Sequence, residues 1–138
     1  MLRITNNAFC FLLFAFYFLT VFTSCRKAGT GGDASLMVSP QHHGTPVSNH
    51  IGYPDTVFLK FNVDELPGTK ASDYDTYFVG TPPDVYVHCE RLKAGKYYIY
   101  VTGFDSIAGP YRVTGGVPLN IKYSERKDMI DVIVPVTE

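Results

Sequence analysis

Apolar and polar residues alternate along most of the chain beyond residue 33. A period of two is typical of β-strands with one buried face, and no segment shows the 3.6-residue period of an amphipathic helix. The pattern predicts strands at residues 34–39, 57–64, 85–90, 97–102, 117–122 and 129–136, with a short seventh at 111–113. These runs are rich in β-branched and aromatic residues and are bounded by turn-forming residues. We therefore expect an all-β fold, a single antiparallel sandwich of about seven strands.

The alternation also predicts which side chains are buried. In the last run, Val132 and Val134 fall on the uniformly apolar face, whereas Ile133 and Pro135 fall on the other face. A sheet with one packed and one solvated face produces such a division. Cys89 falls on the apolar face of its run and is expected in the core. Pro135 lacks an N–H group, so the last strand is expected to have an unpaired edge near its end.

The segment 62–84 is long for a connection between two strands. Connections of this length are usually functional or disordered. Its aromatic residues Tyr74, Tyr77 and Phe78 are sufficient to dock it onto the domain. We expect it to cover an edge strand, which would be a structural role.

Residues 1–25 follow a different pattern. Arg3 precedes an unbroken apolar run at 8–22, and Thr23 and Ser24 then lead to Cys25. A positive charge, an apolar run and small residues in this order are typical of a secretory signal. A membrane-spanning anchor is the alternative, but a helix over 8–22 would be roughly 22 Å long and a bilayer core is about 30 Å thick. An ordinary cleaved signal peptide with an incidental cysteine is the other alternative.

The small residue before Cys25 resembles the end of the lipobox of bacterial lipoproteins. The resemblance implies cleavage before Cys25, a diacylglycerol on its thiol and acylation of its amine. Phe22 departs from the pattern, because the family usually has an aliphatic residue three positions before the cysteine. The protein would then be exported and held on a membrane by lipid. The outer membrane is expected, because Arg26 provides no inner-membrane retention signal of the Asp type.

Removing residues 1–24 as a signal peptide changes the charge and the thiol count. Of the 12 Lys and Arg and the 13 Asp and Glu, only Arg3 is lost, which leaves a net charge of −2. This balance argues against a nucleic-acid partner. Residues 25–33 are expected to form a flexible tether, and 34–138 to form one domain. Cys89 would be the only thiol left beside the lipidated cysteine, so no intramolecular disulfide is expected.

The segment 85–104 reads VYVHCERLKAGKYYIYVTGF. It resembles the strand–turn–strand unit of carboxypeptidase-regulatory-like and collagen-adhesin B-type domains, which are transthyretin-like sandwiches. The resemblance implies that Leu92 closes one end of the core and that Tyr97 enters the core beside it. Between them the chain turns, and Gly95 can take the positive φ that the turn requires.

The motifs that match these families are architectural, and none of them contains a catalytic residue. GTPV at 44–47 resembles a Gly-x-Pro-aliphatic segment of the same families, and the whole outline is similar to lipoproteins of Bacteroidetes-type bacteria. The final Tyr-Arg-Gly-Ser of transthyretin-like hydroxyisourate hydrolases is replaced by 136–138, VTE, and the first strand lacks the Lys of isopeptide-forming adhesin domains. We see no Ser-His-Asp set, zinc-protease motif or phosphate loop. No enzymatic activity is expected, and a hydrolase is the least favoured hypothesis.

Three histidines are candidates for a metal site. His42 and His43 lie at a predicted turn, and His88 lies at an outward position of a predicted strand. His is a common metal ligand, and a site needs three or four converging ligands. If the turn packs near that strand, the protein could be a periplasmic metal-binding protein. The simpler interpretation is solvent-facing histidines, because neighbours in an extended chain point to opposite sides.

Tyrosines are the other candidates for a binding surface. Tyr86, Tyr98 and Tyr100 point outward by alternation, and Tyr74 and Tyr77 lie in the long connection. Exposed aromatic rings stack on sugars or pack on proteins, although they also pair across strands as ordinary β-formers. The main hypothesis is therefore a non-catalytic binding or assembly module of the cell envelope, with a protein or glycan partner. No cofactor is expected beyond the covalent lipid.

Overall fold

The computed structural model describes residues 27–138, so the predicted signal peptide and Cys25 lie outside it. These residues form eight strands and two short 3-10 helices, which confirms the all-β class. No helix in this part of the chain is long and apolar enough to cross a membrane. The strands are β1 (Thr30–His42), β2 (Thr45–Pro46), β3 (Thr56–Phe61), β4 (Thr76–Val79), β5 (Val87–Leu92), β6 (Gly95–Asp105), β7 (Tyr111–Ile121) and β8 (Met129–Val136).

The helices η1 (Ala71–Asp73) and η2 (Tyr123–Glu125) connect β3 to β4 and β7 to β8. The predicted strands are all present, with bounds that differ by a few residues. The short strands β2 and β4 were not predicted, because two to four residues are too few to show a period. The predicted runs at 111–113 and 117–122 belong to one strand, β7.

One sheet is built around β1. It pairs antiparallel with β5 and with the short β2, and parallel with β8, where His42 lies opposite Val136. The prediction of a fully antiparallel fold is therefore wrong for this pair. Alternation specifies the faces of a strand and not its direction, and the whole intervening domain serves as the long crossover that parallel neighbours need. β8 lies at an edge of this sheet. The edge that Pro135 predicts to be unpaired is closed just beyond the strand, where Thr137 pairs with Thr114 of β7.

The other sheet is antiparallel, in the order β4-β3-β6-β7. Its longest pair is the β6–β7 hairpin, which is paired from Gly95 opposite Ile121 to Asp105 opposite Tyr111. β7 has a glycine at position 116, opposite Tyr100. A Cβ at this position would lie 2.7 Å from the ring of Tyr98. A glycine within a strand often marks such a close approach.

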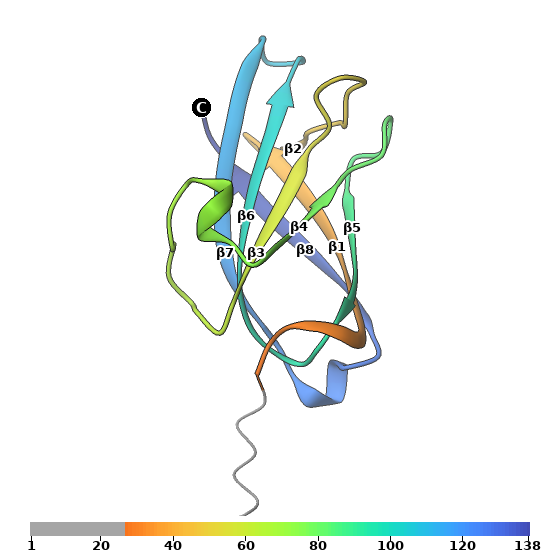
Figure 1. The fold of residues 1–138 in the computed structure, drawn as a ribbon. Coiled ribbons are helices and arrows are strands. Elements are labelled where there is room, and N and C mark those ends of the chain that lie inside the picture. Colours follow the sequence, from red (N-terminus) through yellow and green to blue (C-terminus); the bar gives the residue numbers. More distant parts are fainter. Residues whose placement is uncertain (1–26) are drawn as a thin grey trace, which may run out of the picture.

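The two sheets lie face to face and share one core (Figure 1). Val132 and Val134 belong to it, whereas Ile133 is 59% exposed, as the alternation predicts. Cys89 is fully buried, and burial raises the pKa of its thiol to about 12. The most deeply buried aliphatic members come from both sheets and include Leu36, Val38, Val57, Leu59, Val87, Ile99, Val101 and Val134.

The corner between β5 and β6 confirms the expected arrangement. Leu92 and Tyr97 are both fully buried, and Gly95 has a φ of 150°. A Cβ at Gly95 would lie 2.5 Å from the backbone nitrogen of Ala28. The glycine is therefore required both by the turn and by the close approach of the N-terminal segment.

That N-terminal segment is fixed to the domain rather than loose. The N–H of Ala28 donates to Asn62 Oδ1 at 2.9 Å, and the N–H of Gly29 donates to Tyr97 Oη at 3.0 Å. β1 already begins at Thr30. The expectation of a flexible tether is thus wrong for 28–33. Gly32 allows close backbone approach, since a Cβ there would collide with the carbonyl of Leu92.

Tyr97→Phe is expected to loosen this segment. The hydroxyl also lies 2.6 Å from the carbonyl oxygen of Lys93 and 2.9 Å from that of Gly29, so its loss leaves partly buried groups without a partner. We expect a loss of about 1–2 kcal/mol in the free energy of unfolding. Amide hydrogen exchange should become faster in 28–33 before it changes elsewhere. Tyr77→Phe, at an exposed ring, is the matched control, and equal protection of 28–33 in both variants would contradict the prediction.

Candidate functional site

The sheet face predicted to bind a partner is covered by the protein itself. Tyr98 and Tyr100 are only 9% and 6% exposed, so the prediction that they form an open aromatic surface is wrong. Tyr74 stacks on Tyr100 with ring centroids 5.5 Å apart and planes 15° apart, and burial raises the pKa of its hydroxyl. The alternation correctly placed Tyr98 and Tyr100 on the face opposite the core. It does not show which segment folds over that face.

The long connection therefore has the structural role expected of it. β4 extends the second sheet along β3, with Phe58 opposite Tyr77, and covers that edge. Tyr74 holds the preceding loop by donating its hydroxyl hydrogen to the Gly68 carbonyl at 2.7 Å. Tyr77 is exposed, and its ring lies 6.2 Å from that of Phe58 at the margin of the covered cluster, whereas Tyr86 is half-buried. The five predicted tyrosines therefore do not form one open binding face.

The two most exposed of the large apolar side chains described lie at one end of the domain. We call this the loop end; it consists of the connections 43–55, 80–86 and 105–110. It lies opposite the end where the chain enters at residue 27 (Figure 1). Ile51 is 92% exposed and Ile107 is 72% exposed. Tyr53, Val85 and Tyr111 are also exposed there.

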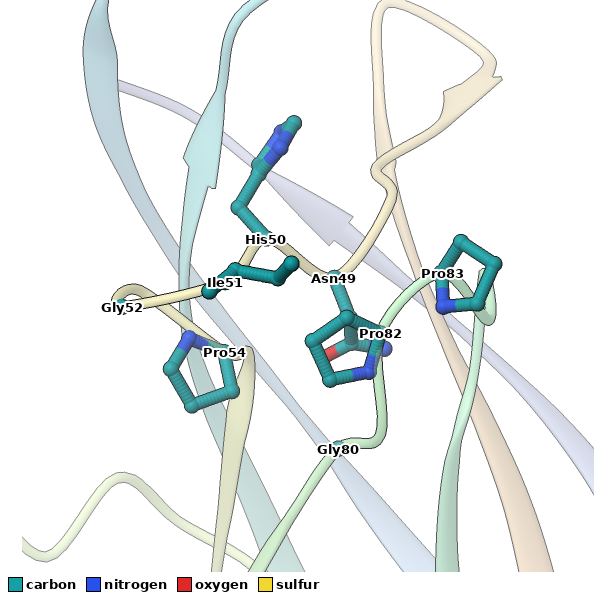
Figure 2. Close-up of a pocket in the computed structure, with 8 residues that line it drawn as sticks. All are labelled: Asn49, His50, Ile51, Gly52, Pro54, Gly80, Pro82 and Pro83. Atoms are coloured by element: carbon teal, nitrogen blue, oxygen red, sulfur yellow. The ribbon is translucent and has the colours of Figure 1, made fainter.

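A shallow pocket of about 810 Å³ opens at the loop end between two connections. Figure 2 shows its lining, in which Ile51, Pro54 and Pro82 lie around one opening. Asn49 holds the two connections together. Its side-chain nitrogen donates to the Asp84 carbonyl at 2.9 Å. The full lining is Asn49, His50, Ile51, Gly52, Pro54, Gly80, Pro82 and Pro83.

The first of these connections packs on the end of β6 through ring contacts. Tyr53 stacks on Phe104 with centroids 5.6 Å apart, and His50 meets the same ring edge-on at 6.1 Å. His50 also lies 3.1 Å from the hydroxyl of Ser106. The loop end is therefore a supported surface whose apolar side chains face outward, and it can bury them against a partner.

A carboxylate is buried beneath this surface. Asp55 is fully buried, and the backbone N–H of Phe104 compensates only weakly for the burial of its carboxylate. Burial raises the pKa of this carboxyl to about 6. The sequence analysis missed it, because an Asp after a Pro at the start of a strand is typical of an ordinary turn.

The three candidate histidines do not come together. His88 lies on β5 opposite Met37 and pairs with Glu90 at 3.3 Å. His42 is five residues further along β1, a separation of about 16 Å in an extended strand. The predicted site that combines His88 with His42 or His43 is therefore wrong.

His42 and His43 have other neighbours. His42 is buried, and its Nδ1 lies 2.7 Å from Asp105 Oδ2. The rings of His42 and His43 lie 4.2 Å apart, and Glu138 Oε1 lies 4.0 Å from His42 Nε2. The carboxylates of Asp105 and Glu138 escaped the sequence analysis, since they come from distant parts of the chain.

Comparisons of the chain with models of protein families, with curated proteins and with solved structures find no significant match.

Proposed function

We propose that this protein is a lipid-anchored module of the bacterial cell envelope that binds another protein through its loop end. One observation carries the proposal. Residues 28–33 are fixed at one end of the domain shortly after Cys25 in the sequence, and the two most exposed apolar side chains lie at the opposite end (Figure 1). A lipid on Cys25 would hold the first end at the membrane and direct the second end away from it.

The anchoring part of the proposal rests on the sequence of residues 1–25. A charged start, an apolar run and a small residue before Cys25 support a lipoprotein signal. Several acyl chains would hold the protein stably, since each buried CH₂ contributes about 0.8 kcal/mol. We also propose that the domain is transthyretin-like, which is supported by the two-sheet arrangement and by the corner that contains Leu92, Gly95 and Tyr97.

The character of the loop end favours a protein partner over a glycan. Sugars are bound mainly by the flat faces of aromatic rings, whereas Ile51 and Ile107, the most exposed apolar side chains here, are branched aliphatic residues. Protein interfaces bury aliphatic and aromatic side chains together in a patch surrounded by polar groups. Tyr53 and Phe104 supply the aromatic part of this surface.

The test is a site-specific photo-crosslinking experiment in the producing cells. A photoreactive amino acid at position 107 is expected to form a discrete crosslinked protein adduct, whereas the same group at 133 on β8 forms none. Ile51→Asp should reduce the adduct from position 107 at least tenfold without lowering the melting temperature, because Ile51 packs on little of the domain.

Three results would contradict the proposal. Equal adducts from positions 107 and 133 would remove the loop end as the binding surface. Crosslinks to lipid alone would indicate that Ile51 and Ile107 enter a membrane. Cleavage of wild-type and Cys25→Ala proteins at the same position, with neither carrying acyl chains, would remove the lipid anchor.

A further inference from the structure

A group of titratable side chains lies where β1, β6 and the chain after β8 meet. His42, His43 and Glu138 each place one nitrogen or oxygen atom within 4.8 Å of the other two. Asp105, from the end of β6, contacts His42 from the other side. None of these residues lines the pocket at the loop end, so the group requires its own explanation.

The parallel pairing of β1 with β8 brings the group together. His42 lies opposite Val136, so Glu138 emerges two residues beyond this point. Thr137 is held between them by reciprocal backbone hydrogen bonds with Thr114, each 2.8 Å long. The backbone that carries Glu138 is therefore fixed beside His42, although the side chain itself is exposed.

The backbone at the turn directs both histidines to one side. In an extended chain, neighbouring side chains point in opposite directions. His43 instead has a φ of 49°, in the left-handed region that few residues other than glycine adopt. This bend brings the centroids of the two imidazole rings to 4.2 Å from each other. The expectation that neighbouring histidines point apart therefore does not hold here.

Asp105 determines which ring nitrogen of His42 can bind a further group. One carboxylate oxygen accepts hydrogen bonds from the N–H groups of Ile107 and Ala108, and the other lies 2.7 Å from His42 Nδ1. A carboxylate oxygen accepts in such a contact, so the proton lies on Nδ1 of His42. The lone pair of Nε2 is then directed toward Glu138. A carboxylate that orients a histidine in this way is common around zinc.

We propose that His42 Nε2, His43 and Glu138 bind one divalent transition-metal ion of the zinc class, with Asp105 as a positioning residue. The 4.0 Å between His42 Nε2 and Glu138 Oε1 is too long for a hydrogen bond but close to the ligand spacing of about 3.4 Å in a tetrahedral zinc site. Rotation of the exposed side chains of His43 and Glu138 closes the difference. Two imidazoles with one carboxylate favour zinc over magnesium or calcium, and they leave a fourth position for water.

The test is metal titration of the full-length protein in detergent after treatment with a chelator. Zn²⁺ is expected to bind with a stoichiometry of one and to raise the melting temperature. Co²⁺ should give the visible absorption of a four-coordinate nitrogen–oxygen site. His43→Asn and Glu138→Gln should each weaken zinc binding at least tenfold, and both side chains are exposed, so neither change should prevent folding.

His88→Asn is the matched control, because His88 is an exposed histidine beside a glutamate outside the group. Asp105→Asn should weaken binding about 10–100-fold and should alter the Co²⁺ spectrum, which a merely structural role would not do. Zinc affinity that is unchanged by Glu138→Gln, or reduced equally by His88→Asn, would overturn the proposal. So would the absence of zinc binding at millimolar concentration. These titrations contain no partner protein, so they are independent of the function proposed for the loop end.

Discussion

Val132→Asp is expected to unfold the domain or to bring it close to unfolding. Val132 is 8% exposed, lies opposite Val38 on β1, and belongs to a core cluster without a charged member among residues 27–138. An unpaired charge in such a place costs several kcal/mol, and a domain of this size has a total stability of only about 5–15 kcal/mol. Urea denaturation followed by circular dichroism measures the loss.

Ile133→Asp is the matched control, since it makes a charge of the same kind one residue further along β8. Ile133 is on the opposite face and largely exposed, so its replacement should cost less than about 1 kcal/mol. The pair tests the assignment of faces, because a shift of one residue in a strand exchanges them. If Ile133→Asp were the more damaging change, the faces of β8 would be inverted.

Asp55→Asn is expected to stabilise the protein at pH 8 and to change it little at pH 3.5. The folded pKa of about 6 lies above the ordinary value of 3.8, so the folded state binds a proton more tightly than the unfolded state. The stability that protonation supplies is complete below about pH 4 and is lost as the pH rises through 6. A shift of about two units corresponds to up to about 3 kcal/mol. The neutral amide avoids that loss.

The measurement is the free energy of unfolding of both proteins at several pH values from 3.5 to 8. Wild-type protein should lose stability relative to Asp55→Asn mainly between about pH 4 and pH 6, and the difference should stay constant above this range. Asp131→Asn, which removes an exposed carboxylate on β8, is the control and should give no such difference. A constant difference between wild type and Asp55→Asn at all pH values would contradict the prediction.

Local sequence patterns predicted the features of the fold that depend on neighbouring residues. The period of two correctly placed Val132 in the core and Ile133 outside it, and it placed Cys89 in the core. The corner with Leu92, Gly95 and Tyr97 was expected from the resemblance of one strand–turn–strand segment to known domains. In each case the residues that determine the structure lie within one strand or turn.

Features that depend on contacts between distant segments were not predictable. Nothing in the local pattern shows that Tyr74 covers Tyr100, because a side chain directed away from the core can still be buried by another segment. The same holds for Glu138 beside His42, which depends on the direction of β8 relative to β1. The exposed apolar tips Ile51 and Ile107 lie in loops, where hydrophobic periodicity carries no information.

The position of β8 beside β1 has a consequence for how the chain folds. Their pairing closes a loop that contains nearly the whole domain, and the entropy of loop closure must be lost before the contact contributes anything. Domains dominated by such distant pairings have a high contact order and fold in milliseconds to seconds rather than microseconds. Until β8 has been synthesised and docked, the apolar face of β1, with Leu36 and Val38, lacks its final neighbour. During this interval the nascent chain is most open to aggregation.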